Sequence, residues 1–379
     1  INPAAPHYLG QTPAGVEPEA DCPRRVTISP DGRRAVITNV LSGNAVLLNL
    51  ETLAVEATFP ISPRPQDVAI TSDSRWAVVC AMENNEVDII DLEAGAIVAS
   101  VPTNTRPSLL SILPDDSRAM VATIQGNTVS VVRLAGAASF READIPVGEI
   151  GLTWAGYGVG SDVQCSPAGR YTICAISFEN TVKVIDRNTN TVVATLPTGT
   201  FPLQAAFEAT GEYATVTNYQ GNSFTVLRVT GAGSSVVGNF PCGQGPLRVG
   251  YDPVHDRMGI ANLSSKTITF ANPRTGAILG TQNVTSHGSP LQVLFDASGD
   301  PLVLTTSNHR LVYNGGTVTL PATPAQFDYS PSSRKAVVAM PGPDWVTVVS
   351  FPTSGVPEVA TVPLRGGTIL SIGPNPGSG

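Results

Sequence analysis

The sequence predicts an all-β protein that folds as a single β-propeller of four-stranded blades, with eight blades favoured and seven as the alternative. Two observations predict this fold. A strand–turn–strand segment recurs eight times along the 379 residues, and the composition is typical of short strands joined by tight turns. Gly (36 residues) and Pro (32 residues) are abundant, whereas charged residues make up 14% of the chain, against roughly 25% in ordinary soluble proteins.

The repeated segment alternates between two faces with a period of two and is rich in Val, Ile and Thr, which is typical of strands. Its eight copies begin at Ser29, Thr71, Leu113, Ser166, Glu208, Tyr251, Asp296 and Ser330. Most successive copies lie about 42 residues apart, which is the spacing expected of propeller blades with four strands each. Helical repeats share such spacings, but this chain has no convincing amphipathic helix pattern.

Each copy divides into four expected strands. The innermost strand follows a Pro and ends at a turn rich in Asp, Ser and Gly. In the first copy the second strand is expected at 33–39, the third at 44–52 and the fourth at 54–61. The seventh copy has a shortened outer part at 309–321, so we expect a stunted seventh blade.

We divide the chain into an N-terminal arm (1–21), the propeller (22–363) and a C-terminal tail (364–379). The arm is rich in Pro and Gly. The tail contains GGTILSIG at 366–373, which is similar to an innermost strand. We expect this segment either to pair at the seam where the ring closes or to lie over that seam.

The copies resemble a known group of repeats. The fourth copy reads NTVKVIDRNTNTVVATLPTG at 180–199, and strands end with VITN at 36–39 and TVTN at 215–218. These segments resemble the YVTN family of β-propellers, and the resemblance covers 22–363. It implies the propeller fold. The family is similar to lactonase-type enzymes, surface-layer proteins and binding modules alike, so the resemblance implies no particular catalytic residue.

Charge and hydropathy exclude several classes of partner. The formal charge is −8 and no stripe of Lys and Arg is present, so nucleic acid is not an expected partner. No apolar run approaches the ~18 residues of a membrane span. The chain begins with Ile, so we expect a processed product whose signal peptide has been removed. The expected location is secreted, periplasmic or cell-envelope, and the expected state is a monomer.

Aligning the copies reveals a polar position two residues after each Pro that leads into an innermost strand, or after Gly160 in the fourth copy. The residues at this position are Arg25, Asp67, Leu109, Asp162, Gln204, Arg248, Gln292 and Gln326. The next residue is apolar in every copy. Because these strand starts converge on one mouth of a propeller's axis, we expect a ring of seven polar side chains there.

This ring has two interpretations. Two Arg, two Asp and three amides can satisfy one another as a structural collar, since buried charges are normally paired. Alternatively, the two arginines bind an anionic or carbonyl oxygen, one aspartate acts as a base, and the amides contact the substrate. Gln164 and Asp328, two positions further along their strands, are secondary candidates.

Loops that join second to third strands border the same mouth. Three of them carry side chains that can hold a ring or an apolar body: Tyr219, His309 and Trp345. His287 lies in a loop before an innermost strand, and either this histidine or His309 can act as a general acid or base.

The interval between the third and fourth copies contains about 11 extra residues, in a Gly-rich segment at 149–162. It carries Trp154 and Tyr157 and leads directly into Asp162. We expect an aromatic flap over the mouth, because loops longer than the repeat are where repeat proteins place specificity. The alternative is a packing insertion that fills a wider gap between two blades.

No cofactor and no metal are expected. The chain has no CxxC spacing, and its four His lack the spacing of metal ligands. Cys80, Cys165 and Cys174 fall at repeat positions of small or apolar buried side chains. Cys22 and Cys242 lie in rim loops, where a bridge between them is one alternative.

These observations favour a metal-free enzyme that acts on a small organic molecule in a polar pocket at the mouth, as a lactone hydrolase or with isomerase or cyclase chemistry. The alternative is a non-catalytic binding module or interaction scaffold. The candidate catalytic residues are Asp67, Asp162, Arg25, Arg248, His287 and His309. The candidate substrate-binding residues are Gln204, Gln292, Gln326, Trp154, Tyr157, Tyr219 and Trp345.

Overall fold

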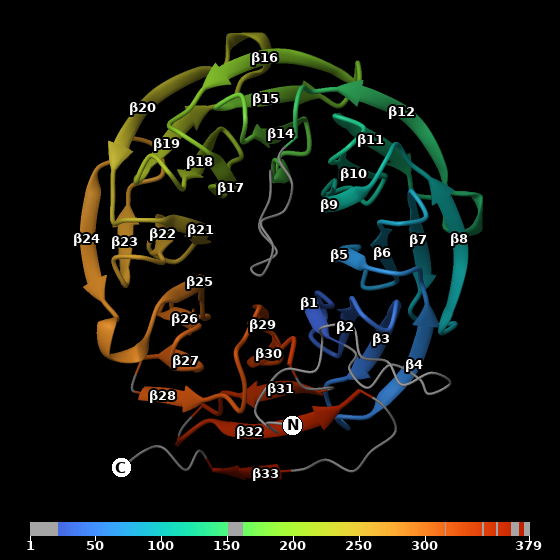
Figure 1. Cartoon of the computed structure of the whole chain (residues 1–379), viewed down its shortest axis with the longest axis vertical. Coiled ribbons are helices and arrows are strands. Elements are labelled where there is room, and N and C mark those ends of the chain that lie inside the picture. The colour runs from blue at the N-terminus through green and yellow to red at the C-terminus, as the bar shows by residue number, and fades with distance from the viewer. Residues whose placement is uncertain are drawn as a thin grey trace, which may run out of the picture.

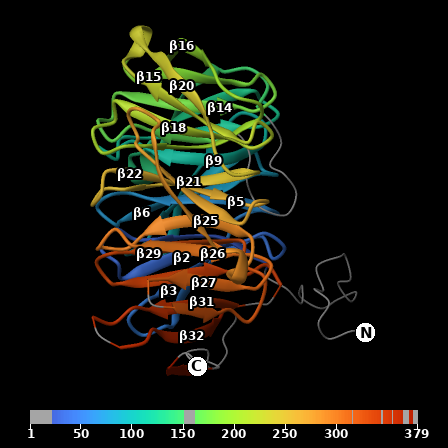
Figure 2. The same ribbon diagram turned by 90° about the vertical axis from the view of Figure 1, so that its left-hand side faces the viewer.

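The computed structural model is a closed ring of eight antiparallel blades, which confirms the predicted eight-bladed propeller (Figure 1). The structure describes residues 22–150, 162–314, 316–342, 345–353, 355–364 and 371–374. In side view the ring is a thick disc with loops on its two faces (Figure 2). Each blade consists of four strands that are consecutive in the chain, and the eighth blade has a fifth.

The strands occupy the following positions from the axis outward. The innermost strands are β1 (Pro23–Ile28), β5 (Pro65–Ile70), β9 (Pro107–Ile112), β13 (Val163–Cys165), β17 (Pro202–Phe207), β21 (Pro246–Asp252), β25 (Pro290–Phe295) and β29 (Gln326–Ser330). The second strands are β2 (Arg34–Asn39), β6 (Trp76–Ala81), β10 (Arg118–Thr123), β14 (Tyr171–Ile176), β18 (Tyr213–Asn218), β22 (Arg257–Asn262), β26 (Pro301–Thr305) and β30 (Lys335–Ala339). The third strands are β3 (Asn44–Asn49), β7 (Glu86–Asp91), β11 (Thr128–Arg133), β15 (Thr181–Asp186), β19 (Ser223–Arg228), β23 (Thr267–Ala271), β27 (Arg310–Tyr313) and β31 (Trp345–Ser350). The fourth strands are β4 (Val55–Pro60), β8 (Ala96–Pro102), β12 (Phe140–Pro146), β16 (Thr191–Pro197), β20 (Ser235–Pro241), β24 (Ile278–Asn283), β28 (Gly316–Thr319) and β32 (Glu358–Pro363).

The turn between the first and second strands explains the recurring Asp, Ser and Gly. In every blade this turn contains one residue with φ between +48° and +79°, the left-handed region that glycine and short polar residues tolerate best. The residues are Gly32, Ser74, Asp116, Gly169, Gly211, Asp256, Gly299 and Arg334. The turn chemistry therefore sets where each innermost strand ends.

Helical content in the described residues is limited to three 3-10 turns, η1 (Gly136–Ala138), η2 (Gly231–Gly233) and η3 (Thr285–His287). None of the helices in this part of the chain has the length and apolar composition needed to cross a membrane.

The core lies between adjacent blades, because each sheet buries both of its faces against its neighbours. One apolar cluster joins Val26, Ile37 and Val46 of the first blade to Val337 and Val348 of the eighth. This packing closes the ring between strands that come from opposite ends of the chain, and no blade mixes N-terminal with C-terminal strands.

Two expectations about the outer strands are resolved. The stunted seventh blade is confirmed, because β27 and β28 have four residues each. The tail strand β33 (Ser371–Pro374) pairs with β32 and forms the outermost strand of the eighth blade. It thus lies on the outer edge of the last blade, away from the innermost strands that it resembles in sequence.

Candidate functional site

The innermost strands pose a hydrogen-bonding problem. Each is an edge strand, so the N–H and C=O groups on its axial side have no strand partner. Side chains from the preceding blade supply the missing partners. Asp67 Oδ2 accepts the backbone N–H of Leu110 at 3.0 Å, and Asp162 Oδ2 accepts that of Ala205 at 3.1 Å. Each carboxylate therefore caps the edge of the next blade.

The same contact recurs around the ring. At three further seams a glutamine side chain supplies the cap. Gln204 Oε1 accepts the Val249 N–H (3.1 Å), Gln292 Oε1 accepts the Phe327 N–H (3.2 Å) and Gln326 Oε1 accepts the Val26 N–H (2.7 Å). Where the third blade has Leu109, Ser111 Oγ accepts the N–H of Cys165 at 3.1 Å. We call these capping side chains, together with Arg25, Arg248, Gln164 and Asp328, the seam collar.

The two collar arginines bridge the seams that follow their own blades. Arg25 Nε lies 3.6 Å from Asp67 Oδ1, and Arg248 Nη1 donates to Gln292 Oε1 at 2.8 Å. A polar contact between innermost strands thus crosses all eight seams of the described ring. The structure brings the predicted ring residues together as a connected collar, and their predicted catalytic and substrate-binding roles remain predictions.

The secondary candidates Gln164 and Asp328 belong to the collar too. Asp328 Oδ2 accepts the N–H of Ile28 at 2.8 Å, and Gln164 Nε2 donates to both oxygens of Asp162 at 3.2 Å. Asp328 therefore contacts the next blade, whereas Gln164 contacts Asp162 of its own blade.

Burial sets the protonation of the collar carboxyls. Burial raises the pKa of Asp162 to about 6, although the Ala205 N–H and the Gln164 amide act in the opposite direction. Burial likewise raises the pKa of Asp328 to about 6 against the N–H groups of Ile28 and Tyr329. The pKa of Asp67 is also raised by burial, despite the guanidinium of Arg25.

These pKa values predict that the protein becomes more stable as pH falls from about 7.5 to about 5. Folded Asp162 and Asp328 bind protons near pH 6, whereas aspartates of the unfolded chain do so near pH 3.9. Their stabilising contribution is therefore complete below about pH 4 and is lost as pH rises through about 6. Thermal unfolding across this range is expected to show a rising Tm on acidification. The Asp162→Asn/Asp328→Asn variant should flatten that rise, and a wild-type Tm that falls throughout the range contradicts the assignment.

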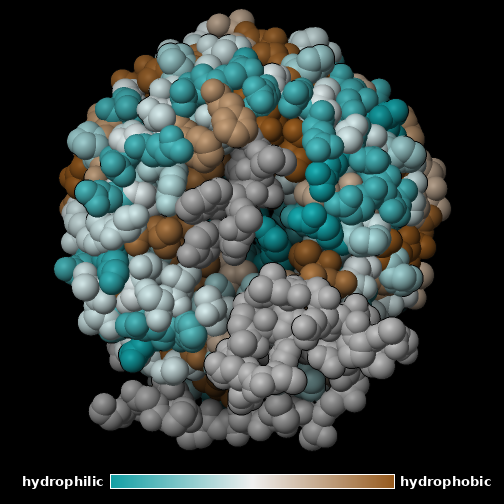
Figure 3. All heavy atoms as spheres, viewed as in Figure 1, coloured by the Kyte–Doolittle hydropathy of each residue, from teal (hydrophilic) through white to brown (hydrophobic). Residues whose placement is uncertain are grey.

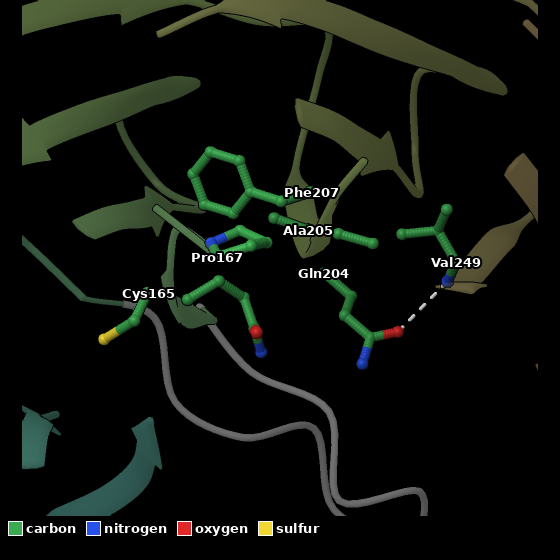
Figure 4. Close-up of a pocket in the computed structure, with 8 residues that line it drawn as sticks. Cys165, Pro167, Gln204, Ala205, Phe207 and Val249 are labelled. Carbon is green, nitrogen blue, oxygen red and sulfur yellow. Dashed lines mark hydrogen bonds between the residues drawn. The ribbon is translucent and has the colours of Figure 1, made fainter. Parts of the chain in front are cut away.

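A cavity of about 300 Å³ lies beside the collar among the fourth, fifth and sixth blades (Figure 4). Its lining residues are Gln164, Cys165, Pro167, Gln204, Ala205, Ala206, Phe207 and Val249. Gln204 Oε1 is occupied by the Val249 N–H, so its Nε2 is left as a donor, and Gln164 uses Nε2 on Asp162, so its Oε1 is left as an acceptor. Within the described residues neither atom has another partner. The cavity therefore presents one amide donor and one amide acceptor.

The other predicted site residues lie elsewhere. His309 Nε2 is 2.8 Å from Thr323 Oγ1, and the carbonyl of His287 accepts the Thr305 hydroxyl at 2.7 Å, so both histidines are tied into the seventh blade. Tyr219 and Trp345 pack at the margin of an apolar cluster. None of these four lines the cavity of the described structure. Trp154 and Tyr157 lie outside the described residues.

Sequence reasoning missed a set of rim residues at the starts of innermost strands and in the neighbouring loops on the mouth side. These residues are Arg24, Arg64, Arg106, Phe178 and Phe201. A usable signal was present, because four of them directly precede or follow the Pro that opens an innermost strand on the mouth side. No disulfide joins Cys22 to Cys242 in the described structure.

No protein-family model and no curated protein sequence matches the chain. Solved structures resemble its fold. Kuenenia stuttgartiensis hydrazine synthase superposes with a TM-score of 0.63 at 17% identity, covering 91% of this chain and 100% of that one. The Myceliophteria thermophila Cps50 (Swd1) β-propeller domain gives 0.58 at 10% identity, covering 79% and 98%.

A functionally unknown protein from Desulfotomaculum acetoxidans gives a TM-score of 0.57 at 17% identity, covering 92% of this chain and 98% of that one. Identities this low establish the propeller fold and nothing about activity. Membership of the YVTN family stays a prediction.

Proposed function

We propose that this propeller binds a small polar organic molecule in the cavity beside Asp162. The observation that carries the proposal is the pair of amide atoms, Gln204 Nε2 and Gln164 Oε1, that lack partners in the described structure and line one cavity of about 300 Å³. Both glutamines are half-buried, so these two atoms are open to the cavity and can exchange water for the polar groups of a ligand that fits there. A molecule with a carbonyl group and a hydroxyl or N–H group meets both requirements.

Acid–base catalysis at the same cavity is a second candidate function, and the pKa of Asp162 favours it. A carboxyl with a pKa of about 6 can both release and accept a proton near neutral pH. Both Asp162 oxygens lie 3.2 Å from the Nε2 of Gln164, which lines the cavity. Lactone hydrolysis, isomerisation and cyclisation of a carbonyl compound all require such a proton transfer. The known proteins of similar fold lend no support to any one of them.

The proposal also includes the family, oligomeric state and location that we expect from the sequence. It takes the chain as a YVTN-type propeller that acts as a monomer outside the cytoplasm, in a secreted, periplasmic or cell-envelope location. The ligand is taken from the surrounding medium.

The test is ligand binding by a Gln204→Glu variant. This change keeps an oxygen to accept the Val249 N–H but removes the Nε2 donor from the cavity. In a thermal-shift screen of lactones, hydroxy acids and neutral sugars, we expect at least one compound to stabilise the wild type and to bind the variant about tenfold more weakly, as expected for one lost hydrogen bond. Gln282→Glu on β24 is the matched control and should bind as the wild type does.

The same screen separates binding from catalysis. For a compound that is turned over, Asp162→Asn is expected to lower kcat by about 10²-fold or more while the compound still binds. Binding with no turnover of any compound leaves a binding module. If no compound stabilises the wild type, or if Gln204→Glu binds as tightly as Gln282→Glu, the cavity is not the site.

A further inference from the structure

Arginines lie at or directly before the starts of the innermost strands of the first three blades. Arg64 and Arg106 directly precede Pro65 and Pro107 and adopt left-handed conformations, with φ of +64° and +61°. Arg24 directly follows Pro23. The corresponding residues before the innermost strands of the fifth to eighth blades are uncharged: Phe201, Gly245, Ser289 and Thr323. At the described positions next to the starts of innermost strands, the arginines therefore lie in one sector of the mouth.

The three arginines have too few carboxylates around them. Arg106 Nη2 and Arg64 Nη1 share a single oxygen, Glu83 Oε1, at 2.9 and 3.8 Å. No hydrogen bond or ion pair joins the Arg24 side chain to another residue of the described chain. Burial, Arg25 and Arg64 together lower the pKa of Arg24, as expected for a cation crowded by cations. This sector therefore carries excess positive charge, although the whole chain has a net charge of −8.

Asp67 does not neutralise this sector, because it is already engaged. Its Oδ1 lies 3.6 Å from Arg25 Nε, and its Oδ2 accepts the Leu110 N–H at 3.0 Å. An incoming anion therefore has guanidinium groups available to it and little competition from protein carboxylates. On this face, hydrophilic residues gather beside the axis over β5 and β9 (Figure 3).

An exposed aromatic pair lies on the same face in the next two blades. Phe178, in the loop between β14 and β15, is 55% exposed and meets Phe201 edge to face, with ring centroids 5.9 Å apart. Loops that lead into innermost strands and loops that join second to third strands lie together at the mouth. In the fifth blade the N–H of Tyr219 bonds to the carbonyl of Phe201 at 2.9 Å, and in the third blade the N–H of Ile124 bonds to the carbonyl of Arg106 at 3.0 Å. A large exposed ring next to a polar site is available to hold an apolar ligand body.

We propose that this rim is a second binding site, which takes an organic anion with an aromatic or apolar body. Arg24, Arg64 and Arg106 bind its carboxylate or phosphate oxygens, since guanidinium groups match both anions in bidentate geometry. Phe178 and Phe201 contact its body. The third blade, which carries Arg106, packs directly against the fourth, which carries Phe178. The rim site shares no residue with the cavity and is independent of the function proposed for it.

The test is calorimetric titration of the full chain with phenylacetate, inorganic phosphate and the uncharged 2-phenylethanol. The Arg64→Ala/Arg106→Ala variant is expected to bind phenylacetate and phosphate about tenfold more weakly, since charge-assisted bonds are lost. The matched control is Arg33→Ala/Arg170→Ala, which removes the same charge from exposed turns between first and second strands. It should bind as the wild type does. Raising the salt concentration should weaken wild-type binding.

The Phe178→Ala variant distinguishes binding of the ligand's apolar body from binding of its anionic group. It is expected to weaken phenylacetate binding about tenfold and to leave phosphate binding unchanged, since only the apolar contact is removed. The proposal is overturned if the two arginine variants bind alike, if 2-phenylethanol binds as tightly as phenylacetate, or if Phe178→Ala changes nothing. Gln204→Glu should not affect any of these titrations, so failure at the rim and failure at the cavity are distinguishable.

Discussion

An Arg248→Ala variant is expected to lose about 3–5 kcal/mol of unfolding free energy, in the range of large-to-small substitutions in a core. Arg248 is 2% exposed and is among the largest fully buried side chains of the described structure. Its Nη1 donates to Gln292 Oε1, the same oxygen that caps the N–H of Phe327. Removing the side chain leaves a cavity at the seam and loosens the cap of the next blade.

Urea unfolding measures this loss of unfolding free energy, and two further variants identify its cause. Arg248→Met restores most of the volume and should recover part of the stability. Arg228→Ala, whose side chain is 52% exposed, should change stability by less than about 1 kcal/mol, as is usual for surface ion pairs. If Arg248→Ala unfolds at the wild-type urea concentration yet loses ligand binding, Arg248 acts on a ligand and the collar is not its main role.

The Gln326→Ala/Asp328→Ala variant is expected to lose about 2–6 kcal/mol, because it uncaps two backbone N–H groups at about 1–3 kcal/mol each. Gln326 caps Val26 and Asp328 caps Ile28, both across the seam between the eighth and first blades. The chain itself crosses the other seven seams, whereas among the described residues this one is held by side-chain contacts and apolar packing. Its loss should therefore open the ring locally.

Hydrogen exchange at the amides of Val26 and Ile28 reports that opening directly. Exchange there is expected to accelerate in the variant before the rest of the ring is affected, as in sub-global unfolding. The matched control is Asp162→Ala/Gln204→Ala, which uncaps Ala205 and Val249 at seams that the chain crosses. The control should lose less stability and leave exchange at Val26 unchanged. Equal losses from the two double variants would show that the closing seam is not the weak point.

The collar also narrows the search for ligand contacts. A carboxylate or amide oxygen that already caps a backbone N–H has less capacity left for a substrate, because it offers few remaining lone pairs in suitable directions. The atoms available to bind a ligand are therefore collar atoms that cap no backbone group, such as Gln204 Nε2, and the guanidinium nitrogens of the rim arginines. Asp162 and Asp328, each with a pKa raised to about 6, are collar groups whose protonation changes near neutral pH.

The sequence alone favoured eight blades over seven and predicted most strand positions and the stunted seventh blade, and the structure confirms eight. These features follow from local chemistry: strand propensity, a period of two and turn residues that accept left-handed conformations, as Gly32 does with φ of +74°. It also placed the polar ring positions correctly in one tier of the ring.

The tertiary structure alone decided what those positions contact. A period of two tells which side chains share a face but not what that face meets. The partner of Asp67 is the N–H of Leu110, 43 residues further along the chain, and it needs a cap only because the strand edge faces the axis. The cavity between Gln164 and Gln204 and the sharing of Glu83 by two arginines likewise exist only once the blades are packed side by side.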